Sequence, residues 1–168
     1  MVFHGPVALV MFLGMWSGRS TAQEVDVVPL FNEEVMTARV VTLRDNGELE
    51  IQFNGDDGVL RLDSIRLPDS DSRVRDEADA LLRRRLVGRS VEVHARRSEG
   101  HDDVRVGYTL QEGDDVRVEL IAKGLARFCQ GMVRERRLEQ SDREAKRTGQ
   151  GIWSEDYNEP VPGCGDPA

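Results

Sequence analysis

The strongest constraint on the fold is a series of short apolar segments joined by turns that contain glycine. Residues 36–43 and 49–53 and the segment that begins at Val59 are each rich in apolar side chains at alternate positions. Asp-Asn-Gly at 45–47 and the polar run at 54–58 separate them. Asn and Gly accept the positive φ angles that tight hairpins need, so the sequence predicts three antiparallel strands in a meander.

The third predicted strand carries charge on one face. Leu60 and Leu62 alternate with Arg61 and Asp63, and Pro68 is expected to end the strand because proline cannot donate to a ladder. By itself this pattern is compatible with an edge that handles phosphate, or with an ordinary amphipathic strand followed by a polar loop.

The rest of the chain completes a small barrel. After a predicted helix from Val74 to Leu86, which Gly88 is expected to end, two more alternating strands follow and then two helices. The expected ranges are strands 91–95 and 104–110 and helices 118–128 and 133–147. Gly124 is expected at a close packing point. Five short antiparallel strands with a helix after the third indicate a β-rich α+β domain, a five-stranded OB-fold barrel with three helices, over residues 36–156.

The first 22 residues are typical of a signal peptide. Residues 6–16 form an apolar run too short to span a bilayer, and small residues at Ser20 and Ala22 suit cleavage before Gln23. A buried N-terminal helix is the alternative. We therefore expect a secreted or periplasmic protein with no membrane span after cleavage, a lead-in segment at 23–35 and an irregular C-terminal tail at 157–168.

The charge of the chain limits its partners. Without residues 1–22 the chain has 22 basic and 31 acidic residues, a net charge of −9. Because nucleic-acid affinity comes largely from neutralising phosphates, contact with a polyanion would need a local basic patch.

The chain has two cysteines, Cys129 and Cys164. In an exported chain such a pair usually forms a disulfide, which would stabilise this fold by about 3–4 kcal/mol on the loop-entropy model. Two free thiols or intermolecular pairing are the alternatives.

Four segments resemble the staphylococcal nuclease (thermonuclease) family. Residues 59–69 are similar to its RL-x-x-ID-x-PE stretch, and Gly107-Tyr108 after Arg105 is similar to the strand that follows its second arginine. Residues 119–126 resemble its LV-x-x-GLA helix, and residues 138–156 match its closing helix and GIWS ending without a gap. The resemblance covers residues 36–156 in the right order and implies an OB barrel with helices.

The resemblance also implies a phosphodiesterase centre with one calcium ion, two metal-binding aspartates, a glutamate near the attacking water and two arginines that clamp phosphate. Arg61 and Arg105 fall at the two arginine positions, although the strand after Arg105 is one residue short. Asp69 stands at the glutamate position.

The metal-ligand positions depart from the family pattern. Gly47 stands at the first aspartate, Arg66 at the second, and Leu67 beside it replaces the usual threonine. Asp45 or Glu48 could supply oxygens only if the turn differs. Since Arg66 removes a ligand and adds a permanent positive charge, we expect calcium to bind poorly and no cofactor to be held.

Two functions follow from these residues. The favoured one is an exported module impaired in calcium-dependent hydrolysis, which binds an anionic ligand or a protein through Arg61, Arg66 and Arg105. The alternative is an active nuclease for DNA or RNA with Ca²⁺, in which Asp69 orients water and Asp45 or Glu48 replaces the lost ligands. A purely structural reading remains for Arg66, which could pair with an aspartate of its own loop, at 63, 69 or 71.

Overall fold

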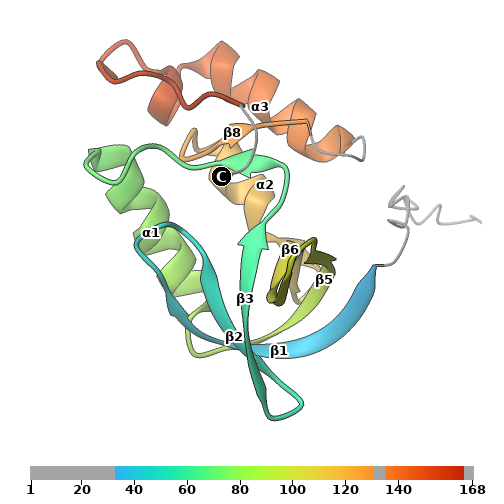
Figure 1. Ribbon diagram of the computed structural model, residues 1–168. Coiled ribbons are helices and arrows are strands. Elements are labelled where there is room, and N and C mark those ends of the chain that lie inside the picture. The colour runs from blue at the N-terminus through green and yellow to red at the C-terminus, as the bar shows by residue number, and fades with distance from the viewer. Residues whose placement is uncertain (1–32, 131–134, 165–168) are drawn as a thin grey trace, which may run out of the picture.

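Five strands close into a barrel in the computed structural model of the protein (Figure 1), which describes residues 33–130 and 135–164. They are β1 (Glu34–Leu43), β2 (Leu49–Phe53), β3 (Asp56–Leu62), β5 (Ser90–Ser98) and β6 (His101–Gln111). The sheet order is β3-β2-β1-β5-β6-β7, where β7 (Asp114–Asp115) is a two-residue strand beside β6, and a parallel pairing of β3 with β6 closes the barrel. The barrel is therefore mixed, whereas the sequence predicted antiparallel strands throughout, because turns reveal only the pairing of strands that are neighbours in the chain.

Helices pack against the barrel, one of them inserted between its strands and the others following the last long strand. They are α1 (Arg73–Leu86), α2 (Val116–Ala122), α3 (Arg136–Thr148) and the 3-10 turn η1 (Gly151–Trp153). The hydroxyl of Ser72 accepts a hydrogen bond from the Arg75 amide at 3.0 Å and caps α1. Beyond the end of α1, Gly88 has a φ of 80°, as its predicted role as a helix stop requires.

One core fills the barrel and the space under α1, α2 and α3. Fully buried side chains come from the inward positions of the strands and from one face of each helix. They include Val40, Leu49, Ile51, Leu60, Leu82, Val93, Leu120, Leu138 and Ile152. The alternation in the sequence thus identified the inward faces of β1, β2, β3 and β5 correctly. In β6 it did not, because Val106 and Leu110 are only partly buried whereas Arg105 and Thr109 are buried.

The segment after β3 differs from the prediction. The strand does not continue to Pro68 but breaks at Ser64, which has a φ of 61°, and resumes as the two-residue β4 (Ile65–Arg66). β4 pairs with β8 (Arg127–Phe128) in a separate ribbon. This pairing joins residues about 60 positions apart, so local alternation could not predict it.

The predicted helix at 118–128 is also shorter in the structure. α2 ends at Ala122 because Gly124 has a φ of 64° and lies against the backbone of Gln150, where a side chain would overlap the carbonyl group. Gly124 is therefore the close packing point that the sequence predicted. In Figure 1, α2, β8 and α3 lie beyond the end of β3 that is opposite the β2–β3 turn.

The predicted signal peptide and most of the lead-in fall on residues 1–32, outside the described part of the chain, as do residues 131–134 and the last four of the tail. β1 begins at Glu34, which is two residues before the domain start expected at residue 36. None of the helices in the described ranges is long and apolar enough to cross a membrane.

Candidate functional site

Gly47 lies in the β1–β2 turn, where side chains from two distant segments meet it. The turn is closed by a hydrogen bond of 2.8 Å from the Arg44 amide to the Glu48 carbonyl oxygen, and Gly47 has a φ of 88°. A Cβ atom at Gly47 would stand 2.7 Å from Cδ1 of Leu67 and 3.3 Å from Nη2 of Arg75. The space beside this position is therefore already filled.

The guanidinium of Arg75 joins three parts of the site. Nη2 donates to the carbonyl oxygen of Asp45 at 2.6 Å, Nη1 to the carbonyl oxygen of Pro68 at 3.0 Å, and Nε to Oδ1 of Asp79 at 2.8 Å. The side chain is 7% exposed. Arg75 thus fixes the β1–β2 turn and the loop before α1 to the first turns of the helix, and it satisfies backbone oxygens of both loops.

These residues do not fit a calcium ion. Calcium takes six to eight oxygen ligands, and several of them are normally carboxylates. Here the two positions that the resemblance assigns to metal-binding aspartates are a glycine and an arginine, and the guanidinium of Arg75 lies beside the glycine. Within the described ranges, no group of three or more His, Cys, Asp or Glu side chains is arranged to hold a metal.

Arg61 and Glu48 form an ion pair across the β2–β3 ladder. Nη2 of Arg61 lies 2.7 Å and Nε 3.1 Å from the same Glu48 oxygen. Burial tends to raise the pKa of Glu48, but hydrogen bonds from Arg61 and from Asn46 outweigh it and hold this pKa below its usual value. Glu48 is therefore an ionised partner of Arg61, placed where an anionic ligand of Arg61 would otherwise bind.

Arg105 lies on the opposite face of the sheet from Arg61. In the parallel β3–β6 ladder, Arg61 is level with Val106 and Leu60 with Arg105, so Arg105 shares the inward face of Leu60. It is 6% exposed, its guanidinium lies 4.2 Å from the centre of the Phe53 ring, and Nε is 3.8 Å from a Glu34 oxygen. The strand after Arg105 is one residue shorter than the family pattern. This difference accounts for the inward position of Arg105, because a shift of one residue along a strand moves a side chain to the opposite face of the sheet.

The remaining predicted residues lie around the loop before α1. Asp45 and Asp69 have exposed side chains, and the carbonyl group of Asp69 accepts a hydrogen bond from the Ser72 amide at 3.2 Å. Of the loop aspartates, Asp63 accepts a hydrogen bond from the Ser64 amide and Asp71 one from the Ser70 hydroxyl. The structure brings Gly47 and Leu67 together, but it does not bring Arg105 alongside Arg61.

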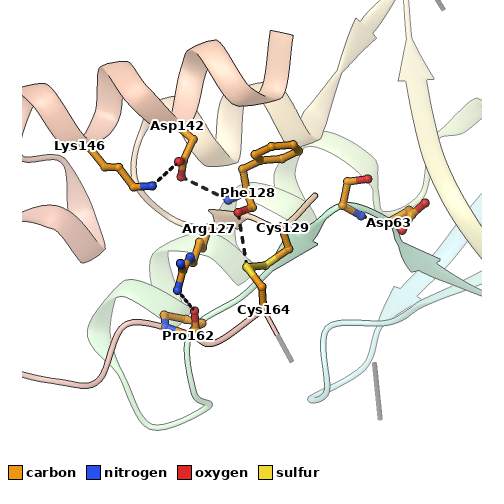
Figure 2. Close-up of a disulfide and its surroundings, with 9 residues drawn as sticks. Asp63, Arg127, Phe128, Cys129, Asp142, Lys146, Pro162 and Cys164 are labelled. Carbon is orange, nitrogen blue, oxygen red and sulfur yellow. Dashed lines mark hydrogen bonds and ion pairs between the residues drawn. A yellow bond between two sulfur atoms is a disulfide. The ribbon is translucent and has the colours of Figure 1, made fainter. Parts of the chain in front are cut away.

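Arg66 is partly buried in β4 and lies directly opposite Arg127 of β8. Figure 2 shows the surroundings of Arg127: the Cys129–Cys164 disulfide, with Cα atoms 5.3 Å apart, fastens the tail beside it. Nη1 of Arg127 donates to the carbonyl oxygen of Pro162 at 2.9 Å. The predicted disulfide is confirmed.

The sequence interpretation missed Arg75 and Arg127. A signal for Arg75 was present, because Arg75 and Asp79 have the i, i+4 spacing of a helical ion pair, but Arg73 and Glu77 have the same spacing and are exposed. The helical pattern distinguishes the two pairs, because Arg75 lies on the apolar face of the helix with Ala78 and Leu82, whereas Arg73 lies on the opposite side. Arg127 follows the Gly-Leu-Ala motif, yet only the β4–β8 pairing connects it to Arg66.

In a comparison with family models, the model described as staphylococcal nuclease homologue matches residues 59–155. A search of curated proteins finds no match to this chain. The matched range is more than half of the chain and includes β3, the loop before α1 and the closing helix.

Proposed function

Because the chain belongs to the staphylococcal nuclease family, we propose that it is a member that has lost calcium-dependent hydrolysis and now binds a compact anionic ligand. It is proposed to act outside the cytoplasm, after removal of residues 1–22. The disulfide supports this location, since disulfides persist mainly in oxidising compartments.

The observation that carries the proposal is the packing of Leu67 and Arg75 against Gly47. A calcium-dependent phosphodiesterase needs the ion both to lower the pKa of the attacking water and to neutralise the phosphoryl group. At this place the chain offers an apolar side chain and a guanidinium that already donates to the oxygens of Asp45 and Pro68. A divalent cation would meet a fixed positive charge a few ångströms away, and the repulsion costs on the order of 8 kcal/mol at about 4 Å and an effective dielectric of about 20.

The charge of the site supports an anionic ligand. Arg66 replaces a carboxylate with a permanent cation, and Arg127 stands opposite it. The net charge of −9 that remains after removal of residues 1–22 opposes long polyanions, so the proposed ligand is a compact anion and not an extended nucleic acid. Arg61 is neutralised by Glu48 and Arg105 faces inward, so neither is proposed as a principal ligand-binding residue.

The experiment is a calcium titration by calorimetry together with a cleavage assay on single-stranded DNA, each with calcium and with a chelator. We expect no saturable calcium binding in the millimolar range and no calcium-dependent cleavage. DNA cleavage that requires calcium, and that is slower in the Arg61→Ala variant, would overturn the proposal in favour of a working nuclease with a rearranged site.

A further inference from the structure

The dipeptide Asn-Gly occurs twice in the chain, each time in a hairpin turn. Asn46-Gly47 lies between β1 and β2, and Asn54-Gly55 lies at the tip of the β2–β3 hairpin (Figure 1). In this dipeptide the amide nitrogen of glycine can attack the side-chain amide carbon of asparagine, because glycine carries no side chain that hinders the approach. The two pairs have different surroundings in the structure, which predicts different reactivity for the same dipeptide.

The pair Asn46-Gly47 is held in place by its neighbours. Gly47 is buried, and its amide donates to the Arg44 carbonyl oxygen at 2.9 Å. Oδ1 of Asn46 accepts a hydrogen bond from the Glu48 amide at 3.1 Å. Leu67 fills the space beside the α carbon of Gly47. A reaction between Asn46 and Gly47 would have to break both hydrogen bonds and move the turn away from Leu67, so the fold protects this pair.

The pair Asn54-Gly55 has none of these restraints. Asn54 and Gly55 have φ angles of 51° and 90°, as a type I′ hairpin turn requires, and both residues are exposed. Within residues 33–130 and 135–164, the Asn54 side chain has no hydrogen-bond partner and the Gly55 amide donates to no acceptor. Apart from the adjoining residues, no atom lies within 4 Å of a Cβ placed at Gly55. Exposed turns with few contacts open at a low cost in free energy, so water and base reach this nitrogen.

We propose that Asn54 is a site of spontaneous deamidation and that Asn46 is protected from it. The Gly55 amide nitrogen gives its proton to hydroxide and forms a bond to Cγ of Asn54. Nδ2 leaves as ammonia, and a succinimide ring results. Water then opens the ring at either carbonyl group and gives aspartate or isoaspartate. The net reaction consumes one water molecule, releases one ammonia molecule and involves no oxidant or reductant.

The modification changes the charge of the turn. The new carboxylate stands next to Asp56 and Asp57, which follow in the sequence and are exposed. The tip of the hairpin therefore becomes more acidic as the protein ages. The inference does not depend on the proposed function, because it concerns a different turn and a different reaction.

The test is incubation of the full, oxidised chain in a mildly alkaline buffer made with ¹⁸O-labelled water, followed by mass spectrometry of its peptides. Digestion after glutamate separates the two asparagines, since Glu48 and Glu50 lie between them. We expect Asn54 to deamidate at least about tenfold faster than Asn46, because hydrogen bonds must break before Asn46 can react. In guanidinium chloride the two sites should react at similar rates, because the protection of Asn46 is lost.

Matched variants confirm the site by the release of ammonia. Asn54→Gln should remove most of the early release, because glutamine would have to form a larger ring, whereas Asn46→Gln should leave the release close to that of the wild type. Thermal unfolding shows that each variant is folded during the incubation. Equal rates at the two asparagines of the folded chain, or a faster reaction at Asn46, would overturn the proposal. So would an Asn54 that stays intact in the folded chain while both sites react in guanidinium chloride.

Discussion

Replacing Arg75 by methionine should destabilise the protein far more than the same change at Arg73. Both arginines lie on α1 and both face an acid four residues later. However, the Arg75 side chain is 7% exposed and the Arg73 side chain 87% exposed. Methionine keeps the apolar stem and has a similar helix propensity, so the comparison isolates the guanidinium and its partners.

The magnitude follows from the three hydrogen bonds of the guanidinium. Hydrogen bonds to a charged group contribute about 1.5–3 kcal/mol each, and removing one partner of a buried ion pair costs about 3–5 kcal/mol. These values do not add. Asp79, whose side chain is 22% exposed, can regain water, whereas the carbonyl groups of Asp45 and Pro68 lose a donor. We expect a loss of about 3–4 kcal/mol for Arg75→Met, against about 0.5 kcal/mol or less for Arg73→Met, an exposed pair at 3.7 Å.

The assay is urea unfolding at pH 7, followed by circular dichroism, with both variants and the wild type at the same salt concentration. The slope of the free energy against urea should be unchanged, so that the shift of the midpoint reports stability alone. A lost buried ion pair should cost well over about 1 kcal/mol. If the free energies of unfolding of Arg75→Met and Arg73→Met differ by less than about 1 kcal/mol, Arg75 does not hold the two loops as described.

The other predictions concern the turn, the ion pair and the tail. Gly47→Ala should cost about 1–3 kcal/mol in urea unfolding, because of its φ of 88° and its contact with Leu67; combining it with Leu67→Ala should cost less than the sum of the two single changes. Additive costs would show that the two residues do not share this space. For Glu48→Gln, the sign follows from a pKa lowered in the folded state: Glu48 stabilises the fold above its ordinary pKa of 4.5, and that contribution is lost as the pH falls below it. The variant should therefore lose less stability than the wild type between about pH 5 and pH 3 in thermal unfolding, and parallel pH profiles would contradict the assigned ion pair. Replacing Cys129 and Cys164 by serine should lower the free energy of unfolding by about 3–4 kcal/mol, and thiol counting on the oxidised wild type should find no free cysteine; a measurable thiol signal would contradict the disulfide.

The local sequence was enough to predict much of the barrel. Alternation fixed the inward faces of β1, β2 and β3, since successive side chains of a strand point to opposite faces. Asn46-Gly47 and Gly88 marked a turn and a helix end where a positive φ is needed, and Gly124 marked a close approach of two backbones. The family and the pairing of the two cysteines also followed from sequence alone, because long motifs and a lone cysteine pair leave few alternatives.

The arrangement of the site was decided by tertiary structure. Which face Arg105 occupies depends on the β3–β6 register, and which carboxylate neutralises Arg61 depends on the β2–β3 register. Only packing decides that Arg75 binds the carbonyl groups of Asp45 and Pro68, and the opposition of Arg66 and Arg127 exists only because β4 meets β8. Local propensity depends on neighbours in the chain, whereas the partner of a charge depends on distant segments that packing brings together. For that reason the sequence determined the scaffold and the positions at which the chain departs from the family pattern, and only the folded structure determined which side chains surround those positions.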